Sequence, residues 1–303
     1  MGEFYLEKRL KETNPNLHKR LTDGISVLDS TLKKYSARYP EYTDHSMFHS
    51  LDIIEFCNEI IGQAQIQKLI PEECYVLLMG AYLHDIGMGI NQKDYILFSE
   101  KLEQMLSDFP RQRDNEPEII RMYHQEYSGL FVRKYADLFD IPEESLVKAI
   151  IQISRGHRKT DLFDEDEYGD IKISCGIIRT AYLSAVLRLA DEMDVSSTRN
   201  PELLFDSVSL NVESQKKIFG IHESIQKVEI KDDMIILYSR PKSQDFIPLV
   251  WNLSQKIQDN LDYCRSVAEK RSDLRIFQKK VVIKPEKAAD SGNGGGFSWG
   301  QTL

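Results

Sequence analysis

The chain has 303 residues, of which 41% are hydrophobic and 29% charged, and its formal net charge at pH 7 is −9. This composition is typical of a globular protein with one large or two modest domains, and it excludes a disordered, collagen-like or disulfide-dense chain. A net acidic chain is also a poor candidate for sequence-independent DNA binding, which depends on clustered lysine and arginine.

The N-terminus and the cysteines favour a cytoplasmic protein without membrane association. The segment Met1 to Leu6 lacks the apolar core of a signal peptide. The longest apolar run, Cys74 to Leu83, is well short of the roughly 20 residues that span a bilayer. The four cysteines lie in apolar stretches without a C-x-x-C pair, as buried thiols in a reducing compartment do.

Residues 1 to about 205 predict a series of helices. Apolar residues recur at helical spacing over 25–35, and a second such pattern follows Ser46, a good helix cap. Pro71 opens a third helix whose body, 74–83, is apolar on every side and therefore fully buried. Further helices are predicted over 94–107, 117–138, 142–154 and 176–193. No strand pattern interrupts this part of the chain.

The pattern changes after Pro201. The elements predicted there are a strand at 208–212, a hairpin of 225–231 and 234–240 around Asp232-Asp233, a helix over about 245–271, and a last strand at 280–284. We therefore expect a mainly α fold with three parts: a helical domain at 1–205, a small α+β extension at 206–285 and a flexible Gly-rich tail at 286–303. The alternative for the tail is that Phe297 and Trp299 dock on a partner.

Six histidine and aspartate residues form a series in which His84 and Asp85 are adjacent and every other step is about one helical hairpin, so all of them can return to the same end of a bundle. They are His49, His84, Asp85, His124, His157 and Asp191, and we call them the six donors. Imidazole and carboxylate together suit divalent metals, and six donors are enough for two ions. The apolar helix that runs into His84-Asp85 supports this interpretation, because a charge beside the core is costly unless it is paired.

In order, spacing and helical context, the six donors resemble the H…HD…H…H…D signature of the bimetallic branch of HD-domain metal-dependent phosphohydrolases. The resemblance covers roughly residues 20–200 and implies an HD-domain helical bundle. It assigns the donors to two divalent ions (Mn, Fe, Co, Ni, Zn or Mg): His49, His84 and Asp191 to the first, His124 and His157 to the second, and Asp85 to both. Met88 stands where HD-GYP phosphodiesterases carry a lysine, and no Gly-Tyr-Pro triplet occurs, which disfavours that subclass.

A narrower resemblance comes from two segments, Tyr42 to His49 and Leu187 to Asp194. They are similar to segments of bacterial HD modules found beside Hsp90-like ATPase domains in defence-type loci. No ATPase segment occurs in this chain.

The candidates for substrate binding are His45, Arg158, Lys159 and Asp194. His45, one turn before His49, would orient a metal ligand, touch the substrate or cap its helix. Arg158 and Lys159 would meet substrate phosphates, or would form a solvated helix end. Asp194 would reach the same cleft or cap the following loop.

Three further features near the donors are predicted to lie at the surface. Glu126 and Ser128, just beyond His124, are expected on an exposed helix face rather than in catalysis. The acidic run from Asp161 to Asp170 is expected to be a mobile loop that covers the site.

We expect a two-metal phosphohydrolase or phosphodiesterase that hydrolyses a nucleotide or related phosphate ester through a metal-bridging hydroxide, with Asp85 and His84 as catalytic residues. Two alternatives remain: a metal-dependent nuclease acting on single-stranded nucleic acid in antiviral defence, and a non-catalytic HD regulatory module. The nuclease would need a basic channel with stacking aromatic residues. The extension or the tail would contact a second copy of the chain or another protein.

Overall fold

The computed structural model describes residues 4–38, 47–112, 115–158, 160–196, 220–221 and 223–286. The chain forms two compact units, which we call the helical unit (Met1–Asp194 and Asn260–Phe277) and the sheet unit (Val195–Asp259 and Gln278–Leu303). The domain boundary expected near 205 and the strand expected at 208–212 lie outside the described residues, as do His45, Lys159 and the tail from residue 287 onwards.

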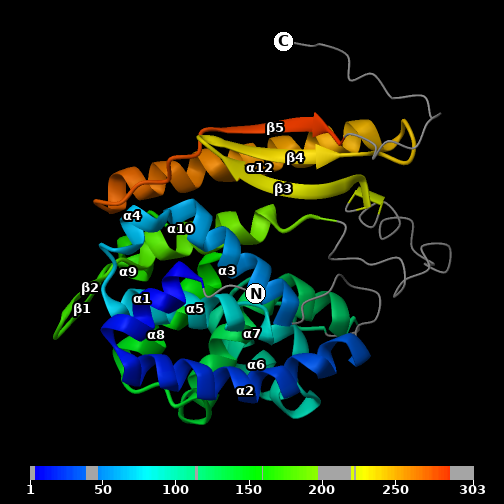
Figure 1. Cartoon of the computed structure of the whole chain (residues 1–303). Coiled ribbons are helices and arrows are strands. Elements are labelled where there is room, and N and C mark those ends of the chain that lie inside the picture. The colour runs from blue at the N-terminus through cyan, green and yellow to red at the C-terminus, as the bar shows by residue number, and fades with distance from the viewer. Residues whose placement is uncertain are drawn as a thin grey trace. The chain divides into compact units, whose positions relative to one another are not determined.

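The fold is mainly α, as the sequence predicts (Figure 1). The helical unit contains, in chain order, α1 (Tyr5–Thr13), α2 (Pro15–Arg38), α3 (Met47–Ile61), α4 (Gln63–Ile66), α5 (Pro71–Leu83), the 3-10 turn η1 (Ile86–Gly89), α6 (Gln92–Met105), α7 (Glu116–Tyr135), the 3-10 turn η2 (Ala136–Phe139), α8 (Glu144–Gly156), α9 (Glu165–Tyr168), β1 (Ile171–Ile173), β2 (Gly176–Ile178), α10 (Thr180–Met193) and the part of α12 (Phe246–Arg271) from Asn260 onward.

Helix α5 forms the centre of the helical unit. Every residue from Glu73 to Leu83 is buried, because α1, α2, α3, α8 and α10 all pack against this helix. Its start follows from the sequence: Pro71 occupies the first turn, and the Glu73 carboxylate accepts a hydrogen bond of 3.2 Å from the Ile70 amide. Because α5 ends at Leu83, its apolar body places His84 and Asp85, which follow directly, in the interior.

A small hairpin interrupts the helical part, which the sequence does not predict. Strands β1 and β2 pair antiparallel, with Ile171 opposite Ile178. Helix α10 consequently begins at Thr180 rather than at the predicted residue 176. The Thr180 hydroxyl is bonded to the carbonyls of Tyr168 (3.0 Å) and Gly169 (3.1 Å), which holds the chain in place where the hairpin ends and the helix begins.

The acidic segment before this hairpin is not the mobile loop that its composition predicts. It includes the short helix α9, which Asp164 caps by accepting a hydrogen bond from the Asp166 amide at 2.9 Å. Leu162 and Tyr168 are fully buried within it. Two apolar anchors therefore hold the segment in place, because their burial outweighs the preference of its acidic residues for solvent.

The sheet unit confirms the predicted hairpin and last strand. Strands β3 (Ile225–Lys231) and β4 (Met234–Ser239) pair antiparallel around a turn in which Asp232 has a φ of 56°. Strand β5 (Lys280–Pro285) lies parallel to β4, so the sheet order is β3-β4-β5. Helix α12 (Phe246–Arg271) connects the two parallel strands, and its Gln258 side chain accepts a hydrogen bond of 2.8 Å from the Val281 amide.

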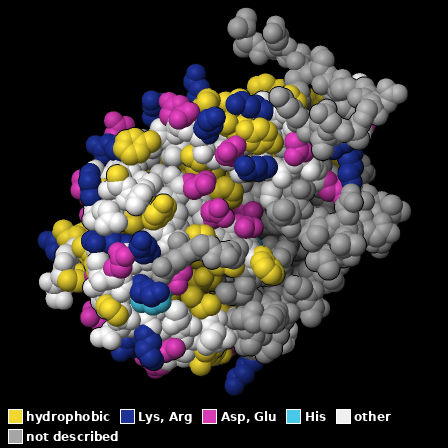
Figure 2. All heavy atoms as spheres, viewed as in Figure 1, with side chains coloured by type: hydrophobic (Ala, Val, Ile, Leu, Met, Phe, Trp, Pro, Cys, Tyr) yellow, Lys and Arg dark blue, Asp and Glu magenta, His cyan; other side chains and the backbone are white. Residues whose placement is uncertain are grey.

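None of the described helices combines the length and apolar character that crossing a membrane requires. On the face drawn in Figure 2, basic and acidic side chains of the described residues are interspersed.

Candidate metal centre

The six donors converge in the interior of the helical unit. His49 projects from α3, His84 and Asp85 from the end of α5, His124 from α7, His157 from the end of α8, and Asp191 from α10. All are buried except Asp191, whose side chain is 20% exposed. Their ligand atoms form two groups, each within 4.8 Å: a first group of His49, His84 and Asp191, and a second group of Asp85, His124 and His157.

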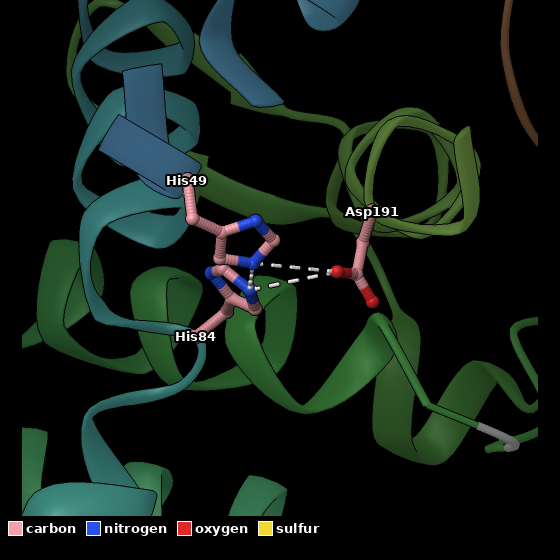
Figure 3. A group of neighbouring side chains, drawn as sticks. All are labelled: His49, His84 and Asp191. Atoms are coloured by element: carbon pink, nitrogen blue, oxygen red, sulfur yellow. Dashed lines mark hydrogen bonds and ion pairs between the residues drawn. The ribbon is translucent and has the colours of Figure 1, made fainter. Parts of the chain in front are cut away.

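The first group brings three helices together (Figure 3). The Nε2 atoms of His49 and His84 lie 3.3 Å apart. Asp191 Oδ1 lies 3.6 Å from His49 Nε2 and 3.8 Å from His84 Nε2. The three ligand atoms therefore face a common point, although their residues are far apart in the sequence.

The second group adjoins the first through Asp85. In this group the Nε2 atoms of His124 and His157 lie 2.9 Å apart, and Asp85 Oδ1 is 3.3 Å from the former and 3.6 Å from the latter. The other carboxylate oxygen of Asp85, Oδ2, lies 3.4 Å from His84 Nε2 and 3.7 Å from His49 Nε2. One carboxylate thus presents one oxygen to each group.

Hydrogen bonds on the far side of each imidazole fix which nitrogen faces the site. The Nδ1 atoms of His84, His124 and His157 each bond the backbone carbonyl three residues earlier, at Ala81 (2.9 Å), Arg121 (2.7 Å) and Ser154. A carbonyl oxygen only accepts, so Nδ1 carries the proton in each of these rings. A neutral ring therefore turns the lone pair of its Nε2 toward the site.

The Asp194 carboxylate takes the corresponding place for His49. Asp194 Oδ2 lies 2.5 Å from His49 Nδ1, and both side chains are almost fully buried. An ionised carboxylate at Nδ1 holds the ring in the same orientation as the three carbonyls do and makes Nε2 a stronger donor. Asp194 is thus directed at a donor histidine, while its role in substrate binding stays a prediction.

The electrostatics of the site fit a cation. Burial lowers the pKa of His124, and it lowers that of His157 further, with the neighbouring His84 and His124 adding to the effect. Neutral imidazoles bring Nε2 lone pairs close together without a proton between them, which is unfavourable unless a positive ion lies there. Burial would raise the pKa of Asp191, but the positive charge that the nearby histidines carry when protonated outweighs it and lowers the pKa to about 2, so this carboxylate is ionised at neutral pH.

Gly87 and Ser128 lock the end of α5 against α7. The Gly87 amide donates to Ser128 Oγ at 2.9 Å, and that hydroxyl donates to the His84 carbonyl at 2.6 Å. A Cβ at Gly87 would lie 2.2 Å from the His124 carbonyl oxygen, so only glycine fits. Ser128 is fully buried, which corrects the expectation that it lies on the helix surface.

Glu126 is also buried rather than exposed. It receives two hydrogen bonds of 2.9 Å from Arg155 Nε and Nη2, and Arg155 also bonds Glu167. A carboxylate that is paired with an arginine tolerates burial, although the spacing of apolar residues along the helix does not by itself predict that Glu126 is buried. Arg155 is consequently engaged within the fold, whereas Arg158, one residue after His157, is exposed.

Sequence reasoning overlooked Arg188, which lies one turn before Asp191 on α10. The residue is 6% exposed, and its guanidinium bonds backbone carbonyls on both sides of His157. The sequence signal was the position of Arg188 within an otherwise apolar stretch of α10. A charge buried there needs a specific set of hydrogen-bond partners.

The HD-CE family model matches residues 39–271 of the chain. The match includes all six donors and extends through α12. No functionally curated protein matches the sequence significantly.

Proposed function

The chain belongs to the HD-CE family, and from this premise we propose that it is a two-metal phosphohydrolase or phosphodiesterase acting on a nucleotide or a related phosphate ester. The observation that carries the proposal is the pair of adjoining donor groups, between which Asp85 presents one carboxylate oxygen to each. A single structural metal needs about four ligands and no shared carboxylate. Two groups of three donors are typical of paired ions that act on phosphate.

Each donor group would hold one divalent cation, the first through His49, His84 and Asp191 and the second through His124 and His157, with Asp85 serving both. Bound there, two cations supply positive charge for a phosphoryl group and lower the pKa of a water molecule. Aspartates 85 and 191 offset only part of that charge, so the centre attracts an anion although the chain as a whole is acidic.

The residues of the chain prepare this site before any substrate arrives. The carbonyls at Ala81, Arg121 and Ser154 and the carboxylate of Asp194 orient the four imidazoles. Burial of the donors excludes bulk water, which strengthens their electrostatic interactions. Asp191 is the most exposed donor, so we propose that substrate approaches from its side, and that Arg158 contributes charge to a bound phosphate.

Metal analysis combined with a phosphate-ester screen tests the proposal. Purified wild-type protein is expected to bind two equivalents of a divalent metal and to hydrolyse at least one nucleotide or phosphodiester. Asp85→Ala is expected to lose both properties, because Asp85 faces both groups. Asp137→Ala, at an exposed position on η2, is the matched control and should retain both. Wild-type protein without bound metal, or metal and activity that both survive Asp85→Ala, would contradict the proposal.

The same screen distinguishes the proposed phosphohydrolase from the alternative function, a nuclease. A nuclease should cleave single-stranded oligonucleotides and bind them with an affinity that falls steeply as salt rises. We expect weak, salt-insensitive binding of oligonucleotides, in keeping with the interspersed charges on the face drawn in Figure 2.

A further inference from the structure

Arg188 connects the helix that carries Asp191 to the turn that carries His157. Its Nε donates to the Gly156 carbonyl at 2.7 Å, and its Nη2 donates to the Thr160 carbonyl at 2.8 Å and to the Thr160 hydroxyl at 3.1 Å. These partners bracket His157 in the sequence. One guanidinium therefore spans the turn between α8 and the segment that follows it, and anchors that turn to α10.

The contact also joins the two donor groups. Asp191 belongs to the first group and lies three residues after Arg188 on the same helix, whereas His157 belongs to the second. Gly156 allows the close approach of α8 and α10, since a Cβ there would lie 2.5 Å from Ser184 Cβ. The position of His157 relative to Asp191 thus depends on how this turn is held against α10.

Tyr263 of α12 supports the guanidinium from the other side. The centre of the Tyr263 ring lies 5.0 Å from Arg188 Cζ, which places the cation over the aromatic face. The Tyr263 hydroxyl accepts a hydrogen bond of 2.7 Å from the Leu162 amide and lies 3.2 Å from Asp161 Oδ1. Tyr263 thereby holds both the arginine and the chain that continues from the His157 turn.

Stability alone does not explain a cation at this position. Among the described residues, no carboxylate forms an ion pair with Arg188, so only oxygens without charge and an aromatic ring offset the cost of burying it. Apolar residues of similar volume often stabilise a fold more than buried charges do. An apolar side chain would not supply a rigid, planar guanidinium, which bonds several oxygens of one turn at the same time.

We propose that Arg188, supported by Tyr263, is a positioning residue that holds His157 in place for metal binding by the second donor group. The inference rests on the proposed function, because it requires the two groups to bind metal. Arg188 acts through the Gly156 and Thr160 backbone, and its hydrogen bonds and ring contact reach Gly156, Thr160 and Tyr263 rather than a donor. Its removal should therefore weaken the second metal selectively and leave the first donor group intact.

Calorimetric titration of metal-free protein with Mn²⁺ tests this proposal, with the bound metal counted after dialysis. Wild-type protein should bind two equivalents. Arg188→Met should retain the first equivalent and bind the second about 10–100-fold more weakly, the usual cost of losing support behind a metal ligand. Arg188→Lys should recover part of this loss, because an ammonium group bonds one carbonyl of the turn but does not span it.

Variants of Tyr263 provide an independent measurement if Arg188→Met does not fold. Tyr263→Phe keeps the ring under the guanidinium and should weaken the second equivalent less than Tyr263→Leu, which removes both ring and hydroxyl. Gln65→Met is the matched control, because Gln65 is also buried and bonds backbone groups at Arg275, far from the donors. It should lower the melting temperature and retain both equivalents.

The outcomes separate the inference from the proposed function. Full affinity for both equivalents in Arg188→Met and Tyr263→Leu overturns the positioning role. An equal loss of the second equivalent in Gln65→Met also overturns it, because general destabilisation would then explain the effect. Wild-type protein that binds no Mn²⁺ or other divalent metal contradicts the proposed function itself.

Discussion

At the scale of single residues, the site depends on what lies behind each donor. Three of the four histidines bond a backbone carbonyl three residues earlier, an arrangement built into the local chain. His49 differs, because its partner is the Asp194 carboxylate, which comes from the other end of the helical domain's sequence. This makes the first donor group sensitive to substitution of a residue that is not itself a ligand.

Replacement of Asp194 tests this dependence. Asp194→Asn removes the negative charge behind His49 while keeping the shape of the side chain, so His49 Nε2 becomes a weaker donor. We expect the affinity of the first metal equivalent to fall about 10–100-fold, with the second little changed. Metal titration monitored by calorimetry measures both. Unchanged affinity for both equivalents would show that Asp194 does not support His49.

At the scale of elements, polar contacts between helices place α6 against α7. Asp94 of α6 is 1% exposed and is bonded by Tyr135 Oη at 2.8 Å and by Lys134. Asn91 caps the same helix by accepting a hydrogen bond of 3.0 Å from the Asp94 amide. Burial by itself raises the pKa of Asp94, but the hydrogen bonds from Lys134 and Tyr135 outweigh it and lower the pKa.

This lowered pKa predicts how stability depends on pH. The contribution of the Asp94 carboxylate is fully present above its pKa in the unfolded chain, and it is lost as pH falls through the lower pKa of the folded protein. Asp94→Asn should therefore reduce the free energy of unfolding by about 1–3 kcal/mol at pH 7. The difference should shrink below about pH 4. Urea unfolding of both proteins across this range measures it, and a difference independent of pH would refute the prediction.

Other elements show where local sequence patterns predict the structure and where they fail. The all-round apolar character of α5 from Cys74 to Leu83 is a property of its own residues, and the structure confirms that this part of the helix is fully buried. The β1–β2 hairpin is too short to produce an alternating pattern, and its two strands are recognisable only by their pairing. The acidic segment before it is held by Leu162 and Tyr168, whose burial depends on the neighbouring elements rather than on local composition.

At the scale of the whole molecule, the helical unit includes a distant segment of the chain. Residues 260–277 belong to this unit, although β3 and β4 of the sheet unit precede them in the sequence. Leu274 and Val267 are fully buried, Gln65 exchanges two hydrogen bonds with the Arg275 backbone, and Arg179 bonds both Glu73 and Asp273. The end of α12 and the loop after it thus complete the unit that carries the donors.

A truncated chain tests this organisation. We expect residues 1–205 alone to unfold at a markedly lower temperature than the full chain, because the truncation exposes the apolar surface that Leu274 and Val267 cover and removes both hydrogen bonds between Gln65 and the Arg275 backbone. A chain ending after residue 285 should keep the melting temperature of the full protein. Circular dichroism during heating compares all three, and equal stability of the 1–205 fragment would show that the C-terminal segment is dispensable.

The sequence by itself determined the helical class, the central buried helix and the six donors with their order, because periodicity and donor chemistry are local properties of the chain. The division into two groups joined by Asp85 was implied by the family resemblance, and the tertiary structure brings the ligand atoms of each group together. Tertiary structure alone decided that Glu126 and Ser128 are buried and that Arg188 holds the His157 turn. The partner of a polar side chain depends on which distant segment packs against it, and no local pattern records that choice.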